Sequence, residues 1–309
     1  MALDRESAHL LIVTPVKDEI NTIEAMVESV LRQSVRFREW VILDDGSTDG
    51  TRDVLRSLTA SVPSVKLIQL SEGPDRRLGR HLTSLVERGL DEAQAVDWLY
   101  WAKLDADVLL APDYFERILD GFADDPKLGI ASGIAKLPGR SGTWRTEWTP
   151  DYFPLGMARL YRRACWTDIG GYTGGRHFDI IDVYAARYRG WHTANFPETA
   201  ARLLRRVDAA MPGQLRRRFE AGRDLYSIGY LPAYFFLRAM RSMWDERPPV
   251  LAGWAMMSGY LLGAAKPVQQ VDEELFRFVR REQRSLLRFA RLLQYWRARV
   301  GGGRTGSSA

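Results

Sequence analysis

The chain has 309 residues, of which 46% are hydrophobic and 27% charged, with a net charge of +5 and one cysteine. This composition excludes disorder of the whole chain, and one cysteine excludes both an internal disulfide and a zinc site built from several thiolates. The first ten residues carry Asp4, Arg5 and Glu6 where the apolar core of a signal peptide would begin. We therefore expect a cytoplasmic protein.

Residues 9 to 134 repeat one pattern, in which a short apolar run precedes a polar segment with helical spacing. This alternation predicts an α/β fold with a mainly parallel central sheet. After the first strand, Asn21 and Glu24 form a capping box that predicts a helix ending near Gln33. The predicted strands are Leu10–Thr14, Trp40–Leu43, Val65–Leu70, Trp98–Leu104 and Leu128–Ile134.

Acidic residues follow the carboxyl ends of two predicted strands, which is where open α/β sheets bind their ligands. Asp44 and Asp45 follow the second strand, and Asp105 and Asp107 follow the fourth. We expect these carboxylates to face one crevice. Carboxylate oxygens suit Mg²⁺ or Mn²⁺, and such a cation stabilises negative charge on a departing diphosphate.

The segment after residue 134 predicts less regular structure. Residues 139–154 are rich in Gly, Trp, Thr and Pro without a clear period, which predicts a long loop near the site. Beyond it, Met157–Arg162 predicts a strand and Asp179–Tyr188 a helix closed by a glycine. Trp191–Phe196 predicts an edge strand.

After about residue 200 the pattern changes to helices. Leu225–Met243 predicts a helix, and Glu273 to Arg299 predicts a basic amphipathic helix. The uncharged run Pro249–Ala265 lies at the lower limit for a bilayer span, and we expect a buried or interfacial helix pair there.

The change of pattern predicts three parts. These are a catalytic domain in residues 1–200, a helical and basic extension in residues 201–300, and a disordered tail in residues 301–309. The arginines of the extension fit nucleic acid, an anionic membrane surface or a solvated basic face. Base-stacking aromatic residues are not interleaved with them in a recognised module, so we expect no nucleic-acid binding. We therefore expect this extension to make peripheral contact with the cytoplasmic face of a membrane.

Three motifs occur in a fixed order along the chain. They are Thr14-Pro15-Val16-Lys17-Asp18-Glu19, then Ile42-Leu43-Asp44-Asp45-Gly46-Ser47-Thr48-Asp49-Gly50, then Leu104-Asp105-Ala106-Asp107. In sequence, order and spacing they resemble the family 2 glycosyltransferases of the GT-A fold. The similarity continues through Gly170-Gly171-Tyr172 to Gly190-Trp191 and covers about the first 200 residues.

The resemblance implies a Rossmann-like GT-A fold and an inverting transfer of a sugar from a nucleotide-diphosphate donor. The acceptor would be a hydroxyl of a glycan, a lipid-linked molecule or a small molecule. Asp107 and Asp105 would hold a divalent metal, Mg²⁺ or Mn²⁺, and Arg206 stands where many members carry a histidine. An arginine there suits the diphosphate as a fixed cation. The residues implied to bind the donor are Pro15, Lys17, Glu19, Asp45, Asp105 and Arg206.

An inverting transfer needs one general base. In the family this base is an acid at the start of the helix after the Gly-Gly turn, and Asp179 matches that position best. Asp182 lies three residues on, on the same helical face, and is the alternative. One of the two acids can instead simply stabilise the positive N-terminal end of the helix, and for Asp182 this explanation stands beside catalysis.

Two other functions compete with this interpretation. A sugar nucleotidyltransferase would also use acidic metal ligands, but it needs a glycine-rich phosphate loop after the first strand, and Pro15 to Glu19 contains no glycine. A catalytically silent nucleotide- or membrane-binding protein could keep the same fold. The presence of all the acidic motif residues favours the transferase.

Overall fold

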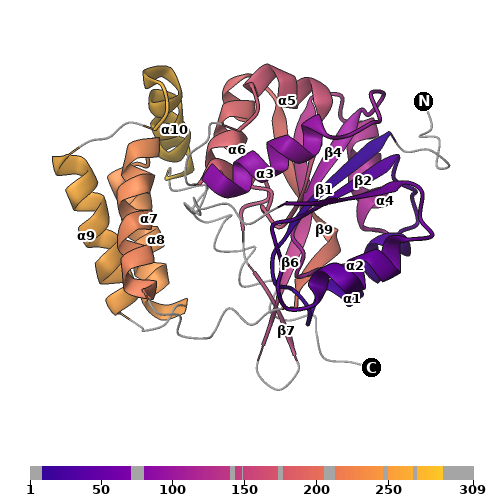
Figure 1. Cartoon of the computed structure of the whole chain (residues 1–309). Helices are drawn as coiled ribbons and strands as arrows, with labels where there is room; N and C mark the ends of the chain where they lie inside the picture. The colour runs from indigo at the N-terminus through magenta and orange to yellow at the C-terminus, as the bar shows by residue number, and fades with distance from the viewer. Residues whose placement is uncertain are drawn as a thin grey trace, which may run out of the picture. The chain divides into compact units, whose positions relative to one another are not determined.

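The computed structural model describes residues 9–70, 80–139, 143–147, 149–172, 177–204, 213–245, 250–266 and 270–287. They belong to two compact units, Met1–Val207 and Asp208–Ala309 (Figure 1). The predicted tail 301–309 and the predicted donor-binding residue Arg206 lie outside the described residues.

The first unit is built on one mixed β-sheet. Its described strands are β1 (Leu10–Val16), β2 (Glu39–Asp44), β3 (Val65–Gln69), β4 (Tyr100–Leu104), β5 (Val108–Leu110), β6 (Leu128–Pro138), β7 (Trp144–Thr146), β8 (Ala158–Arg162) and β9 (His192–Leu203). They pair in the order β3-β2-β1-β4-β8-β6-β9-β5, and β7 pairs with β6. The neighbours β3, β2, β1 and β4 are all parallel, as predicted from the alternating pattern.

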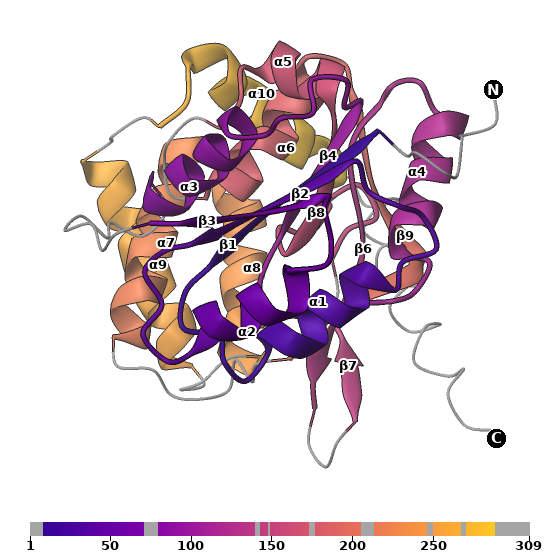
Figure 2. The same cartoon turned by 45° about the vertical axis from the view of Figure 1, so that its right-hand side comes forward.

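Helices cover both faces of this sheet (Figures 1 and 2). The described helices are α1 (Ile23–Leu31), α2 (Thr51–Thr59), α3 (Arg80–Asp91), α4 (Tyr114–Asp124), α5 (Arg163–Ile169) and α6 (Phe178–Tyr188). In β1, Leu10 and Ile12 pack in a core with α1, α2 and α4, whereas Leu11 and Val13 pack in a core with α3, α5 and α6. Burial on both faces explains why these strands are continuous apolar runs in the sequence.

The strand predicted at Trp191–Phe196 is present but longer than predicted: among the described residues its first part, residues 192–196, pairs only with β6, as an edge strand does, and β5 pairs with residues 201–203. The observed strand β9 lies between β6 and β5 and runs on to Leu203. Its pairing jumps from Gly133 opposite Phe196 to Ile134 opposite Ala200, so a bulge absorbs the residues between. The predicted loop at 139–154 also contains the short strand β7, paired with the end of β6.

The predicted capping box at Asn21 and Glu24 is also wrong. The helix α1 begins at Ile23, so Thr22 occupies the N-cap position, and its side chain makes no bond to the helix backbone. Its hydroxyl instead donates to the Glu19 carboxylate at 2.9 Å. The side chain is therefore used to shape the preceding loop rather than to cap the helix.

The second unit is helical, with α7 (Gln214–Ile228), α8 (Pro232–Asp245), α9 (Leu251–Ala265) and α10 (Glu273–Leu286). The helical stretch predicted at Leu225–Met243 is divided between α7 and α8, because Gly229 has φ of 103° and ends α7 in the left-handed region. The predicted helix pair at Pro249–Ala265 is one helix, α9. In the part of the chain that the structure describes, no helix is long and apolar enough to cross a membrane.

Close backbone approach joins α7 to α9. A Cβ atom added to Gly222 would lie 1.9 Å from the Met256 carbonyl oxygen, and one added to Gly259 would lie 1.8 Å from the Phe219 carbonyl oxygen. Real Cβ atoms do not approach backbone so closely. Glycine at both crossing points therefore allows the two helices to pack.

The turn after β2 is organised by the fully buried Asp44. Its carboxylate accepts the Ser47 backbone N–H at 2.9 Å and the Arg52 Nε at 2.7 Å. Burial opposes ionisation, but these hydrogen bonds and the Arg52 charge outweigh it and hold the pKa of Asp44 below its ordinary value. Asp44 therefore serves the loop and the first turns of α2, and its side chain is not exposed to a ligand.

We predict that Asp44→Asn destabilises the protein by about 2 kcal/mol at neutral pH, because a buried, charge-assisted pair of hydrogen bonds is lost. A lowered folded pKa contributes stability above the unfolded pKa of about 3.9, and that contribution is lost as the pH falls through the folded pKa. In urea unfolding, the difference from wild type should therefore be constant from about pH 7 to pH 5 and shrink below about pH 4.

The matched control is Asp53→Asn, because Asp53 is an exposed acid on α2 whose 3.4 Å pair with Arg56 lies at the surface. We expect it to change stability by less than about 0.5 kcal/mol. Equal stability of Asp44→Asn and wild type at neutral pH would contradict the structural role of Asp44.

Candidate active site

Two loops at the carboxyl edge of the sheet are hydrogen-bonded to each other. The Asp18 backbone N–H donates to Ser47 Oγ at 3.0 Å, and the Thr48 N–H donates to Asp18 Oδ1 at 2.8 Å. Asp18 has φ of 52°, an uncommon conformation for an aspartate, which these bonds hold in place. Asp49 adds a bond from the Ile20 N–H at 3.0 Å. The polar residues after Asp45 in the second motif thus fix the loop after β1.

Asp45 is held at the end of β2 by three elements. Its backbone N–H donates to the Val16 carbonyl at 2.9 Å, and the Lys17 ammonium donates to the carbonyls of Asp45, at 2.9 Å, and of Gly46. Its carboxylate Oδ2 lies 2.8 Å from Nε2 of His81 in the first turn of α3. Sequence reasoning passed over His81, since nothing near it in the chain marks it as a partner of Asp45.

Asp105 and Asp107 follow β4, as expected. The Asp105 N–H donates to the Met157 carbonyl at 2.8 Å, and its carboxylate is ion-paired with Lys103, which also donates to the Gly156 carbonyl at 3.1 Å. Lys103 is only 5% exposed, so its ammonium is committed to these partners. The side chain of Asp107 is half-buried.

The structure brings the two acidic groups to one edge of the sheet. Both β2 and β4 are parallel to β1 and lie on its two sides. The loop after β1 contacts both groups, because Lys17 binds the Asp45 carbonyl and the Thr22 hydroxyl lies 3.4 Å from the Ala106 carbonyl. Glu19 is in the same loop, where its carboxylate accepts the Thr22 hydroxyl.

The structure says less about two further residues predicted to bind the donor, Pro15 and Arg206. Pro15 lies inside β1 and pairs with Leu43 of β2. Arg206 lies outside the described residues, but Leu204, two residues before it, donates its N–H to the Asp107 carbonyl at 2.8 Å. The end of β9 therefore lies beside Asp107.

The chemistry of Asp105 and Asp107 fits a hard divalent cation. Mg²⁺ and Mn²⁺ take oxygen ligands, and Mg²⁺ usually binds one or two protein carboxylates with phosphate and water in the other positions. Among the described residues, no group of three or more His, Cys, Asp or Glu side chains is placed to hold a metal. Phosphate oxygens of a donor and water would complete the ligands of a cation bound by Asp105 and Asp107.

The two candidate bases in α6 differ sharply in environment. Asp182 is buried, and both its oxygens lie 2.8 Å from Nη1 of Arg159, which is also buried; Tyr161 donates its hydroxyl to the same carboxylate. Burial alone would lower the pKa of Arg159, but the Asp182 charge raises it, so the guanidinium stays charged. The structure thus places Asp182 in an internal ion pair.

Asp179 is half-buried and lies beside Gly156. A Cβ atom added to Gly156 would lie 3.3 Å from Asp179 Oδ2, so the carboxylate packs against the backbone of Gly156. The Gly156 carbonyl is the one that Lys103 binds beside Asp105. Arg159 donates a hydrogen bond to the backbone carbonyl of Asp179 at 2.9 Å and so holds the first turn of α6.

Curated relatives match part of this chain. A putative teichuronic acid biosynthesis glycosyltransferase TuaG of Bacillus subtilis is 33% identical over 109 residues, which cover 35% of this chain and 40% of that protein. A poly-beta-1,6-N-acetyl-D-glucosamine synthase of Staphylococcus aureus is 25% identical over 138 residues, which cover 45% of this chain and 31% of that protein. The match thus spans less than half of each relative.

Solved structures share the fold. The mannosyltransferase PcManGT from Pyrobaculum calidifontis, in complex with GDP-Man and Mn²⁺, has a TM-score of 0.54 at 16% identity and covers 93% of this chain and 82% of its own. GalNAc-T7 with UDP, GalNAc and Mn²⁺ has a TM-score of 0.56 at 14% identity and covers 87% of this chain and 53% of its own. The predicted α/β fold class is confirmed.

The family match covers more than half of the chain. Residues 11–183 match the family described as Glycosyl transferase family 2. That range contains the three motifs, the Gly-Gly turn and both candidate bases, so the predicted resemblance is confirmed. The chain belongs to glycosyl transferase family 2.

Proposed function

We propose that the protein transfers a sugar from a nucleotide-diphosphate donor to an acceptor hydroxyl, with inversion and with the help of a divalent cation. One observation carries this proposal: Asp45 and the Asp105–Asp107 pair leave β2 and β4 at the same edge, joined by the loop after β1. The relatives support it, because their names describe glycosyltransferases or polysaccharide synthases. A glycan, a lipid-linked molecule or a small molecule remains open as the acceptor.

The donor is proposed to bind along this edge. Asp45 accepts a hydrogen bond from the nucleobase, and Pro15, Lys17 and Glu19 form the wall of the nucleoside pocket. Asp105 and Asp107 face the diphosphate, with Arg206 as a fixed positive charge for it. A cation held by Asp107 and Asp105, when bound, supplies charge stabilisation for the leaving diphosphate.

Asp179 is proposed as the general base. It removes the proton from the acceptor hydroxyl, whose oxygen forms a bond to the anomeric carbon while the bond from that carbon to the phosphate oxygen breaks. The diphosphate departs with the electron pair. Asp182 cannot easily share this role, since its two oxygens are already bound by Arg159 and Tyr161 in the protein interior.

We predict that Asp107→Ala abolishes donor hydrolysis and Mn²⁺-dependent nucleotide binding without unfolding the protein, because the variant loses a carboxylate proposed to bind the metal and the side chain is only half-buried. Calorimetry with UDP and GDP, with and without Mn²⁺, measures binding, and thermal unfolding checks the fold. The control is Asp124→Ala, an exposed acid at the end of α4. Wild-type turnover of Asp107→Ala with Mn²⁺ present would sink the proposed role.

The same calorimetry decides between the transferase and the silent binding protein. Metal-dependent binding of at least one nucleotide, with hydrolysis of the matching nucleotide-sugar, supports the transferase. If wild type binds no nucleotide when Mn²⁺ is present, the silent protein becomes the better interpretation.

We predict that Asp179→Asn and Asp182→Asn separate catalysis from stability. Asp179→Asn should lower donor turnover by about 10²-fold or more, with nucleotide binding unchanged. Asp182→Asn should instead destabilise the protein by about 3 kcal/mol, because it leaves Arg159 charged and buried without its partner. Turnover and urea unfolding of both variants give the comparison. The assignment of the base would be reversed if Asp182→Asn folded normally but lost turnover.

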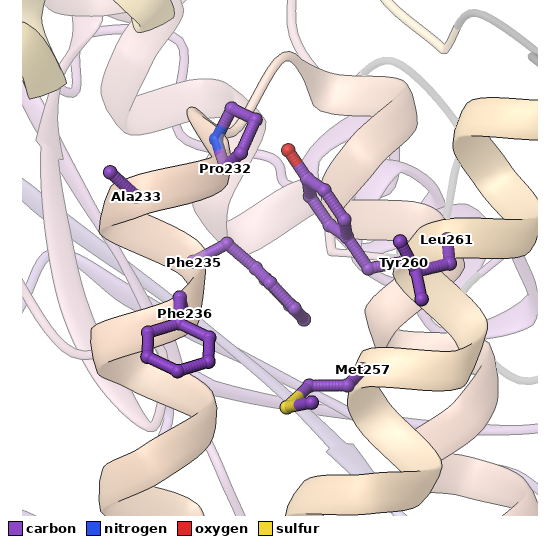
Figure 3. A pocket seen from close by; sticks show the side chains of 7 residues that line it. All are labelled: Pro232, Ala233, Phe235, Phe236, Met257, Tyr260 and Leu261. Atoms are coloured by element: carbon purple, nitrogen blue, oxygen red, sulfur yellow. The ribbon is translucent and has the colours of Figure 1, made fainter.

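Peripheral membrane contact is proposed for the second unit. Large apolar side chains of α8 and α9 are exposed, and between these helices lies an apolar pocket of about 370 Å³ (Figure 3). Residues 208–309 hold 17 Arg and Lys against 9 Asp and Glu, which suits an anionic lipid surface and disfavours pairing with a second copy. The exposed side chains are Phe236, Leu237, Met240, Leu251, Trp254, Leu261 and Leu262.

We predict that the protein sediments with vesicles containing phosphatidylserine at low salt and not with vesicles of phosphatidylcholine alone. Leu261→Glu should weaken this binding, because Leu261 is 68% exposed on α9 and would place a charge in the interface. The matched control is Leu99→Glu, at a leucine that is 52% exposed in the first unit. Protein that stays wholly in the supernatant would remove the proposal.

A further inference from the structure

The pairing of His81 with Asp45 is a contact at the proposed nucleoside end of the site that no motif explains. His81 Nε2 lies 2.8 Å from Asp45 Oδ2, and the two side chains are 27% and 10% exposed. Both side chains are thus mostly covered by protein but keep a surface that a ligand can reach. Asp45 Oδ1 accepts no hydrogen bond from the described residues, so one carboxylate oxygen is available.

The position of His81 is set by how closely α3 packs on the sheet. A Cβ atom added to Gly89 of this helix would lie 2.4 Å from Val13 Cγ1 and 2.8 Å from Leu43 Cδ1. Glycine at this position lets α3 lie directly on β1 and β2, and Val86 is fully buried beneath it. The first turn of α3 is thereby held at the carboxyl end of β2, where Asp45 begins the loop.

The loop after β1, which is proposed to form a wall of the nucleoside pocket, offers no aromatic ring to the base. The loop from Lys17 to Thr22 contains no aromatic residue, and the Lys17 ammonium is bound to the carbonyls of Asp45 and Gly46. An aromatic face is the usual platform for a nucleobase, because each base has a flat π surface. His81 does supply an aromatic ring here. That ring is bound to Asp45, the motif residue that is proposed to contact the base.

We propose that His81 is a specificity-determining residue of the nucleoside pocket, and this rests on the proposed function. Its Nε2 holds Asp45 Oδ2, which turns Oδ1 towards a base, and its imidazole face stacks on that base. A carboxylate oxygen accepts the ring N–H of uracil, thymine or guanine. Adenine and cytosine present a ring acceptor at the corresponding edge, which a carboxylate repels. The pocket therefore prefers bases that carry a ring N–H.

The test is calorimetry of the full chain with UDP, GDP, ADP and CDP in the presence of Mn²⁺. Wild type should bind UDP or GDP more tightly than ADP and CDP. His81→Ala should weaken the preferred nucleotide by at least about tenfold, because both stacking and the hold on Asp45 are lost. It should also bring the preferred nucleotide close to ADP in affinity, which a general loosening of the fold would not do.

Two further variants divide the role of the ring from that of the hydrogen bond. His81→Phe keeps a stacking face and should recover part of the affinity but not the preference over ADP. His81→Gln keeps a donor for Asp45 and should retain the preference at reduced affinity. The matched control is His192→Ala, because His192 also pairs with an aspartate, Asp125, at 2.7 Å, away from the loops of the site. It should bind nucleotides as wild type does.

The outcomes separate this inference from the function on which it rests. If wild type binds no nucleotide with Mn²⁺, the proposed function fails and His81 has no such role. If wild type binds and His81→Ala binds equally well, the proposed function stands and the role of His81 is overturned. An equal loss for all four nucleotides would also overturn it, because the residue would then not set the preference.

Discussion

The candidate site depends on the central position of β1 in the parallel half of the sheet. β1 is hydrogen-bonded to β2 on one side and to β4 on the other, so three chain segments leave the sheet at the same edge. Asp45 belongs to the segment after β2 and Asp105 to the segment after β4. The loop after β1 lies between them and contacts both. Strand pairing alone thus brings together acids that are distant in the sequence.

Two buried, positively charged side chains, those of Lys103 and Arg159, shape the part of the site near α6. Burying a charge is costly unless it is paired, and both are paired here. Lys103 binds Asp105 and the Gly156 carbonyl, and Arg159 binds Asp182 and the Asp179 carbonyl. Each cation therefore fixes a backbone carbonyl as well as neutralising an acid. Because Asp179 packs against Gly156, the candidate base and the loop that holds Asp105 are parts of one connected structure.

The sequence predicted the parallel strands well, because burial on both faces makes them continuous apolar runs. It failed where the deciding contact comes from elsewhere in the chain. β9 was expected to stop at Phe196, since the residues that follow do not look like a strand, yet the bulge opposite Gly133 lets pairing resume at Ala200. Likewise, apolar residues lie on both sides of Gly229, so the sequence pattern did not show that α7 ends there. The positive φ of Gly229 shows that end in the structure.

The same limit applies at the site. The motifs indicated Asp45, Asp105 and Asp179 as candidates, and Asp182 stayed an alternative because the residue that distinguishes the two acids, Arg159, lies on β8. His81 and Lys103 were passed over for the same reason: each touches a motif carboxylate from outside its motif. The motifs contain the carboxylates on which the proposed chemistry depends. His81 and Lys103 determine how two of those carboxylates are held, and each does so through a contact that only the fold creates.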